Sequence, residues 1–270
     1  MRSIIKYTLF SNFTFEKKYF QSIIMNLTFN IVSVILINVL LIIIYKYLET
    51  FWSYKLYKPY KWEKALKNKT VFGKLKKAER KYYDKIRFYT MWFQIERLVK
   101  ENIEGDFVEL GVHKGETAKL IYEMNANRKF HLFDTFKGFN ETDLQHENKQ
   151  GGRYTTNEFS DTDIETVKKY IGGDDRVIFH PGYFPDTAIG LEDKKFSFIH
   201  LDADLYLPTI EGLKFFYTRL SPGGVIIIHD YNHIWDGVKK AVDEFIPTIP
   251  ESLIELPDWK GSVMIVKNKR

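Results

Sequence analysis

Acidic side chains stand at the ends of two apolar stretches of this sequence. The stretch FIHLDADLYLPTI, residues 198–210, begins as a buried strand would and then places Asp202 at the end of its apolar run. The stretch GGVIIIHDYN, residues 223–232, has the same form and ends its apolar run with His229 and Asp230. Carboxylates on neighbouring strands lie about 5 Å apart and repel unless a proton or a cation lies between them. The pattern therefore predicts a site at one edge of a sheet.

Plainer interpretations of these side chains stay open. Asp202, Asp204 and Asp230 could cap helices or accept hydrogen bonds from loop backbone instead of binding a ligand. His200 and His229 could act as bases, although a buried and hydrogen-bonded histidine is the commoner arrangement.

A glycine turn follows the first predicted strand. The sequence VELGVHKGETA places Gly111 and Gly115 where the strand turns into a helix, and glycine lets the backbone approach a ligand closely. The dinucleotide fingerprint GxGxxG fails because His113 stands where its second glycine would be. The looser spacing E-x-G-x-x-x-G is typical of S-adenosylmethionine enzymes, but a purely structural turn could carry the same glycines.

Two further carboxylates could complete a nucleoside site. Asp134 ends the next predicted strand, 19 residues after Gly115, where a carboxylate can accept both ribose hydroxyls of an adenosyl ligand. It could also only cap a turn. Glu109, on the first strand, could orient the glycine loop or bind the amino group of the ligand, and the sequence does not separate these roles.

Strands and helices alternate from residue 88 onward and supply the frame for these residues. Continuous apolar strands between amphipathic helices predict an α/β fold, with a parallel sheet covered by helices on both faces. The stretch SPGG predicts a turn, and two short closing strands predict one antiparallel member. The predicted strands are 106–111, 129–134, 176–180, 196–202, 225–230, 252–256 and 262–268. A long polar segment, 137–163, predicts a lid on the acceptor side of the site or a variable surface insertion.

Five motifs taken together resemble the TylF/MycF-type macrocin O-methyltransferases. They are GDFVELGVHKGETA, HLFDTFKGF, GYFPDT, FIHLDADLYLPT and LSPGGVIIIHDY, within residues 85–250. The resemblance implies a seven-stranded, doubly wound Rossmann-like methyltransferase sheet. It also implies S-adenosyl-L-methionine as methyl donor, a divalent metal, usually magnesium, and a sugar hydroxyl as acceptor.

The resemblance also carries residue roles onto this chain. It makes Asp202 a metal ligand and the catalytic carboxylate, and it makes Asp230 a second ligand. The family has two adjacent aspartates at the second position, whereas this chain has His229 followed by Asp230. Magnesium prefers oxygen ligands, so a site formed by Asp202, Asp230 and His229 departs from the family pattern. A cation held there could lower the pKa of an acceptor hydroxyl.

An apolar run near the N-terminus predicts a membrane helix. Residues 19–45 carry no charge, and residues 23–45 are long enough to cross a bilayer, which takes about 20 residues. A buried helix is the alternative, but the run is unusually long and apolar for one. Residues 1–22 are then an N-terminal tail.

The segment after this run, 46–87, is strongly basic. It carries fourteen Lys or Arg against four acids, a net charge of +10, while residues 1–45 carry +3 and residues 88–270 carry −8. Aromatic residues interleave with its lysines, as in a juxtamembrane linker. A nucleic-acid arm would look similar, but the adjacent apolar run favours the membrane. The larger basic excess after the span predicts a cytoplasmic body.

These features leave three functions to weigh for residues 88–270. The first is a membrane-anchored O-methyltransferase for a sugar of a glycan, glycolipid or glycosylated small molecule. The second is a non-catalytic adenosyl-binding module, in which His229 marks a lost metal site. The third, a nucleic-acid methyltransferase, is disfavoured by the acidic body. The chain has no Cys, which excludes thiol chemistry, and the sequence is compatible with a homo-oligomer.

Overall fold

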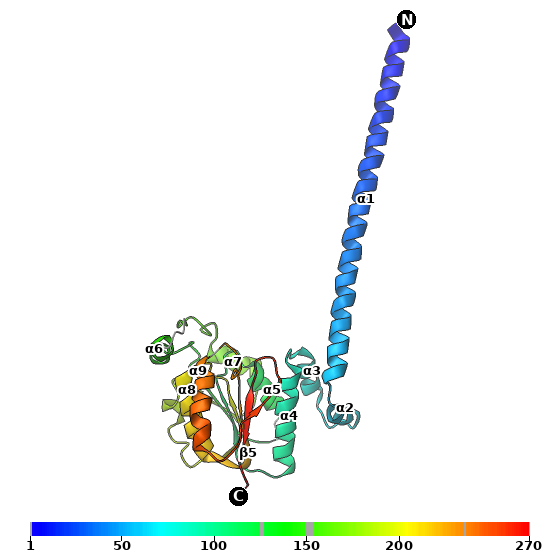
Figure 1. Ribbon diagram of the computed structural model, residues 1–270. Helices are drawn as coiled ribbons and strands as arrows, with labels where there is room; N and C mark the ends of the chain where they lie inside the picture. Colours follow the sequence, from blue (N-terminus) through cyan, green and yellow to red (C-terminus); the bar gives the residue numbers. More distant parts are fainter. Residues whose placement is uncertain (1, 125–126, 150–153, 235, 270) are drawn as a thin grey trace. The chain divides into compact units, whose positions relative to one another are not determined.

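The computed structural model describes residues 2–124, 127–149, 154–234 and 236–269 (Figure 1). The chain forms two units, Met1–Lys58 and Pro59–Arg270, which are described separately.

The first unit is one helix, α1 (Arg2–Tyr57). Its stretch Gln21–Thr50 has a mean hydropathy of 2.7 and is long and apolar enough to cross a membrane. Large apolar side chains along this stretch are exposed, including Phe29 at 71% and Leu36 at 62%. The core helix of a soluble protein is mostly covered, whereas the apolar window of this stretch is not buried in the described chain. Length and composition alone are also compatible with a signal sequence.

The second unit is built on a seven-stranded sheet with the order β3-β2-β1-β4-β5-β7-β6. The five strands from β3 to β5 are parallel, and β7 pairs antiparallel with both β5 and β6. This confirms the predicted Rossmann-like sheet with an antiparallel closing member. The strands are β1 (Asp106–Leu110), β2 (Phe130–Asp134), β3 (Val177–Pro181), β4 (Phe196–Leu201), β5 (Leu220–Ile228), β6 (Ile254–Glu255) and β7 (Val263–Val266).

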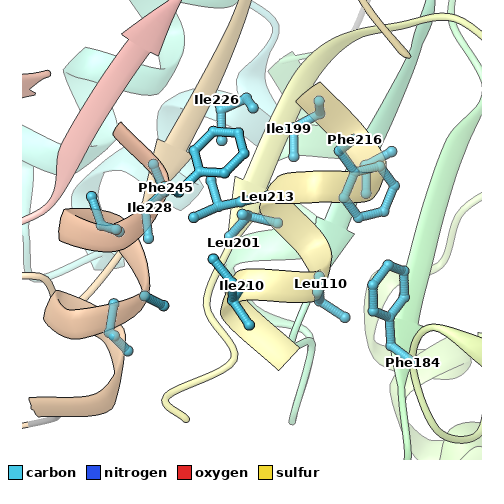
Figure 2. Packing of buried hydrophobic residues seen from close by; sticks show 14 of the residues in the cluster. Leu110, Phe184, Ile199, Leu201, Ile210, Leu213, Phe216, Ile226, Ile228 and Phe245 are labelled. Atoms are coloured by element: carbon cyan, nitrogen blue, oxygen red, sulfur yellow. The ribbon is translucent and has the colours of Figure 1, made fainter. Parts of the chain in front are cut away.

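Helices cover both faces of the sheet because the strands are apolar on both faces. In β5, Ile226 and Ile228 belong to one core and Val225 and Ile227 to the other, as alternation along a strand requires. Figure 2 shows the first core, where Leu213 and other apolar side chains of α8 pack against the sheet. This first core lies under α8 (Tyr206–Arg219) and α9 (Asp236–Phe245), and the second under α4 (Lys85–Lys100), α5 (Glu116–Met124) and α7 (Ile164–Ile171).

Two short helices precede α4 within the segment that we expected to be a linker. They are α2 (Tyr60–Lys67) and α3 (Gly73–Lys81). Trp62 of α2 is fully buried, with its ring edge-to-face against Phe88 at 5.3 Å and Trp92 at 5.0 Å between ring centroids. Such pairs add to the stabilisation from buried area, so these helices are part of the second unit.

Two other segments differ from the expected elements. The stretch SPGG extends β5 instead of forming a turn, because Gly223 N donates to Lys267 O at 2.8 Å beside the antiparallel neighbour. The polar segment 137–163 contains a helix, α6 (Glu141–Lys149), which buries Leu144 in the first core. Residues 150–153 of that expected lid lie outside the described residues.

Gly111 is required where the ends of β1 and β4 meet. Its φ is +88°, and a Cβ there would lie 2.0 Å from the carbonyl oxygen of Asp202. We expect Gly111→Ala to lower the free energy of unfolding by about 2 to 5 kcal/mol, from left-handed strain plus overpacking against rigid backbone. Gly190, with φ +89° and nothing within 4 Å of its Cβ position, is the matched control. Gly190→Ala should lower the free energy of unfolding only by the cost of the left-handed strain, about 1 to 2 kcal/mol. Denaturant unfolding of the detergent-solubilised chain measures both, and equal losses would contradict the role of the close approach.

Candidate functional site

A cavity of about 540 Å³ opens at the carboxyl ends of the parallel strands. Ligands bind at this edge in open α/β sheets. The glycine turn after β1, the ends of β2 and β4, and the residues after β5 all line the cavity. The structure thus brings every site residue predicted from the sequence to one space, apart from Gly115. Gly115 instead packs behind the turn, where a Cβ would lie 3.0 Å from Val167.

Asp202, His229 and Asp230 form the centre of the cavity wall. Their ligating atoms all lie within 4.8 Å of one another. His229 stands between the two carboxylates, with Nδ1 2.7 Å from Asp202 Oδ1 and 3.1 Å from Asp230 Oδ2. The pairing of β4 with β5 sets this arrangement, since His229 N donates to Leu201 O at 2.8 Å.

Arg87 is a member of the site that the sequence did not reveal. It lies in the first turn of α4, and its side chain is 5% exposed. Its Nη2 donates to Thr117 Oγ1 at 2.8 Å and to Asp202 Oδ2 at 3.2 Å, while its Nη1 contacts His229 Nε2. The only local signal is Asp84, three residues earlier, which caps α4 by accepting from Arg87 N at 2.9 Å. That cap predicts where the helix begins but not what the Arg87 side chain meets.

The contact with Arg87 defines the protonation of His229. A guanidinium has only donors, so Nε2 must be the acceptor, and the proton of a neutral ring must then be on Nδ1, facing Asp202. Burial lowers the pKa of His229, but Asp202 and Asp230 raise it by more, to about 9. A second proton would have to enter at Nε2, so it requires Arg87 to withdraw. With Arg87 in place, the imidazole is neutral, and its Nδ1 lies 2.7 Å from Asp202 Oδ1 without forming a hydrogen bond among the described residues.

The charges around Asp202 keep it ionised. Burial by itself would raise the pKa of Asp202. A positive charge on His229 and the guanidinium of Arg87 hold that pKa well below its usual range, and with the imidazole neutral Arg87 is the cation that remains. The neighbouring Asp204 behaves oppositely. Burial and the negative charges of Asp202 and Asp230 raise the pKa of Asp204 well above its usual value. The site therefore combines one strongly ionised carboxylate with one that favours its neutral form.

This geometry tests whether the residues fit the metal that the family resemblance implies. The spacing of Asp202, His229 and Asp230 suits a cation, and their grouping matches the expected ligand set. The imidazole, however, has no lone pair to offer while Arg87 contacts Nε2 and the proton is on Nδ1. Asp202 already has one oxygen near Arg87 and the other near His229. As the chain holds them, these three residues do not fit the oxygen ligand set that magnesium prefers.

Asp134 lies at the end of β2 and binds the glycine turn. Its Oδ2 accepts from Val112 N at 2.7 Å and His113 N at 2.8 Å, and its Oδ1 accepts from Phe136 N at 2.6 Å. The plainer interpretation, a capping carboxylate, is therefore part of its role. A carboxylate has about four acceptor positions, so these three bonds leave capacity for one more donor in the cavity.

Glu109 forms a buried pair with His200 beneath the turn. Glu109 Oε1 lies 3.1 Å from His200 Nδ1, and both side chains are almost fully buried. The other oxygen, Oε2, is buried and has no hydrogen-bond partner among the described residues. Burial, helped by the charge of Asp202, raises the pKa of Glu109 well above its usual value. Burial, helped by Arg87, lowers the pKa of His200 to about 3, so its ring is neutral.

Other parts of the cavity lining come from α6 and the segment after β3. Tyr183 donates its hydroxyl to Asp143 Oδ1 at 2.7 Å, and both residues line the cavity. Burial raises the pKa of Asp143 to about 6. Phe139 and Asn140 add an aromatic ring and an amide to the same lining. This mixture of polar groups and aromatic surface lines the same cavity as Asp202.

Comparison with known proteins gives one family match. A family model described as macrocin-O-methyltransferase (TylF) matches residues 83–264 and confirms the predicted resemblance. The 8-demethyl-8-(2,3-dimethoxy-alpha-L-rhamnosyl)-tetracenomycin-C 4'-O-methyltransferase of Streptomyces olivaceus is 31% identical over 170 residues, which are 59% of this chain and 64% of that protein. The mycinamicin III 3''-O-methyltransferase of Micromonospora griseorubida is 31% identical over 151 residues, 51% of this chain and 59% of that protein. The chain thus matches less than two thirds of either relative.

Solved structures show the same fold. The O-methyltransferase NovP superposes with a TM-score of 0.58 at 24% identity, covering 68% of this chain and 80% of NovP. The calicheamicin methyltransferase CalS11 gives a TM-score of 0.55 at 18% identity, covering 67% of this chain and 78% of CalS11. At these identities the likeness extends to the sheet and its helices, and it confirms the expected fold class.

Proposed function

Because the chain belongs to the macrocin O-methyltransferase (TylF) family, we propose that it is an S-adenosylmethionine-dependent O-methyltransferase. The observation that carries the proposal is the shared cavity, where the glycine turn, Asp134 and Asp202 meet at the carboxyl edge of the sheet. The two relatives described above are named as O-methyltransferases. A donor at the turn and an acceptor at Asp202 would meet across this cavity.

The donor half of the site would consist of the glycine turn and two carboxylates. Gly111 gives the methionine part of the donor close access to backbone. Asp134 would accept a hydrogen bond from a ribose hydroxyl while it holds the turn in place. The unpaired Oε2 of Glu109 would meet the amino group of the donor, which relieves the burial of that oxygen. These roles use the polar atoms that the fold leaves facing the cavity.

The acceptor half would be centred on Asp202. Its carboxylate accepts a hydrogen bond from the acceptor hydroxyl and directs the oxygen at the methyl group. As the new C–O bond forms and the S–C bond breaks, the hydroxyl proton becomes strongly acidic, because a protonated ether is a far stronger acid than a carboxylic acid. Even a carboxylate of low pKa can therefore take that proton late in the reaction. Positioning and charge would supply most of the rate enhancement.

We further propose that the acceptor is a sugar hydroxyl of a glycan, a glycolipid or a glycosylated metabolite. The names of the relatives describe methylation on the rhamnosyl tetracenomycin and on mycinamicin III. Asp143, Tyr183 and Asn140 offer polar partners for a sugar in the same cavity as Asp202, and Phe139 offers a ring face.

The divalent metal is an expectation of the family resemblance, with Asp202 and Asp230 as its oxygen ligands. The residues as the chain holds them do not fit it, because His229 offers no free nitrogen with Arg87 in place. The reaction steps above are therefore derived without a metal. A non-catalytic adenosyl-binding module is the second candidate, and the presence of His229 where the family has an aspartate favours it. Detection of methyl transfer would exclude that candidate.

The membrane helix and the cytoplasmic position of the body are also proposals. The exposed apolar stretch of α1 supports an anchor. The basic excess after this stretch supports a cytoplasmic body, where the donor is made. Two exposed aromatic residues add support, since Tyr60 at the start of α2 is 79% exposed and Phe72, just before α3, is 80% exposed. The side chains of residues 51–57, which contain part of the expected aromatic belt, lie outside those described.

Asp134 gives a test of donor binding. We expect Asp134→Ala to weaken S-adenosylmethionine binding by about 1.5 to 3 kcal/mol, the range for losing a hydrogen bond to a charged acceptor. Calorimetry on the detergent-solubilised chain measures this, with the exposed Asp174→Ala as control. Because Asp134 also holds the turn, thermal unfolding is recorded in parallel. Lower stability with unchanged affinity would leave Asp134 a capping residue only.

Asp202 gives a test of transfer. We expect Asp202→Asn to slow methyl transfer by about 10²- to 10⁴-fold, since it removes a positioned base. Donor affinity should stay within about twofold, because Asp202 belongs to the acceptor half. The assay uses methyl-labelled donor with methyl rhamnoside, other methyl glycosides and a bacterial glycolipid extract, and exposed Asp193→Asn is the control. If Asp202→Asn transfers methyl groups at the wild-type rate, Asp202 takes no part in the chemistry.

The membrane proposal is tested in cells. We expect the protein to stay in the membrane pellet after carbonate extraction, and a C-terminal tag to resist protease added to spheroplasts. Replacing Leu36, Leu40 and Ile43 with lysine should release the chain, since each lysine at the centre of a span costs about 2.5 to 3.5 kcal/mol. Carbonate release of the unaltered chain would exclude the anchor, and digestion of the tag from outside would reverse the topology.

A further inference from the structure

The carboxylate that the family uses to hold a metal is already paired with cationic and donor groups of this chain. We propose that Arg87, together with His229, occupies the cation position at Asp202 and makes this site one that does not take up a divalent metal. The inference deepens the proposed function and rests on it for its chemical meaning. Its test, however, measures metal binding and needs no methyl transfer.

Arg87 is held in this position by the fold. Asp84 accepts from Arg87 N through Oδ1 at 2.9 Å and from Trp259 N through Oδ2 at 3.0 Å, so the start of α4 is fixed on both sides. The ring of Tyr82 lies 5.8 Å from the guanidinium carbon, and Thr117 accepts from Nη2. The guanidinium is 5% exposed and contacts Tyr82, Thr117 and Asp202. It therefore does not move aside as a surface arginine would.

Both ring nitrogens of His229 face other side chains of the site. Nε2 contacts Arg87, and Nδ1 lies 2.7 Å from Asp202 Oδ1. A metal needs an unprotonated nitrogen, and the tautomer fixed by Arg87 offers none. The imidazole therefore lies between Asp202 and Asp230 with its protonated Nδ1 close to both carboxylates, where a metal would require another carboxylate.

The charges of the surroundings agree with this assignment. Asp202 faces Arg87 on one oxygen and His229 on the other, and Asp230 has His233 at 3.5 Å and Lys260 at 4.0 Å. A dication brought to Asp202 would lie close to a buried guanidinium, and like charges at that distance repel strongly in a poorly solvated site.

Arg87 is accordingly a positioning residue. It acts through Asp202 and His229, since it fixes the orientation of the carboxylate and sets the imidazole tautomer. A metal would add direct polarisation of the acceptor hydroxyl. The guanidinium provides the orienting charge without that Lewis acidity.

Manganese(II), observed by electron paramagnetic resonance, is the probe. The full-length chain in detergent is titrated with Mn²⁺ as wild type, Arg87→Gln, His229→Asp and the double variant. We expect wild type to show no saturable binding that depends on Asp230. The double variant, which restores adjacent carboxylates and removes the guanidinium, should gain saturable binding, at least about 10- to 100-fold tighter than any residual binding by wild type. Asp230→Asn added to the double variant should abolish the new site.

Each outcome decides the proposal. The proposal would be overturned if wild type binds Mn²⁺ saturably, if Asp230→Asn removes that binding, and if Arg87→Gln and His229→Asp do not strengthen it. If Arg87→Gln fails to fold, judged by loss of S-adenosylmethionine binding in calorimetry, His229→Asp alone and the more conservative Arg87→Lys decide. Arg87→Lys should keep the wild-type exclusion of Mn²⁺ because the charge remains. A chain that excludes Mn²⁺ but transfers no methyl group would refute the proposed function and leave this inference intact.

Discussion

Buried negative charge at one edge of the sheet is the constraint around which this site is built. Seven carboxylates line one cavity, and four of them, those of Glu109, Asp202, Asp204 and Asp230, belong to β1 or to the segments that follow β4 and β5. Carboxylates so close cannot all be ionised without compensation. The chain compensates them unevenly, since Arg87 holds Asp202 ionised while burial favours the neutral forms of Glu109 and Asp204. Asp202 is thereby kept as a charged group of the cavity.

This selection depends on parts of the chain that lie before the sheet. Arg87 can reach Asp202 only because α4 begins at Lys85, capped by Asp84. The start of α4 is in turn packed against α2, where Trp62 contacts Phe88 and Trp92. The helices that precede the sheet therefore help to set the electrostatics of the site. Without α2, α3 and α4, the same sheet would carry the same carboxylates but would have no fixed cation beside Asp202.

The frame of the site could be predicted from the sequence, because its signals are local. Apolar strands ending in Asp, a glycine turn, and the order of five motifs place Gly111, Asp134 and Asp202 at one edge. Arg87 could not be predicted, since it meets Asp202 across 115 residues and no local pattern marks a buried arginine. The helix α6 was also missed, because it too depends on contacts between distant parts of the chain. Its sequence is polar, and it is stabilised by tertiary contacts such as the one in which Glu147 accepts from Tyr206 N.

The residues at positions 87 and 229 have to be considered as a pair. With Arg87 but a carboxylate at 229, the guanidinium would face two acids and could bridge them in place of a metal. With His229 but no arginine, Nε2 would be free to ligate a cation together with Asp202 and Asp230. Only the combination present here uses both nitrogens of the imidazole and both oxygens of Asp202 within the chain itself. The departure from the adjacent aspartates of the family is therefore coherent with Arg87, and the chemistry of the site follows from their contact.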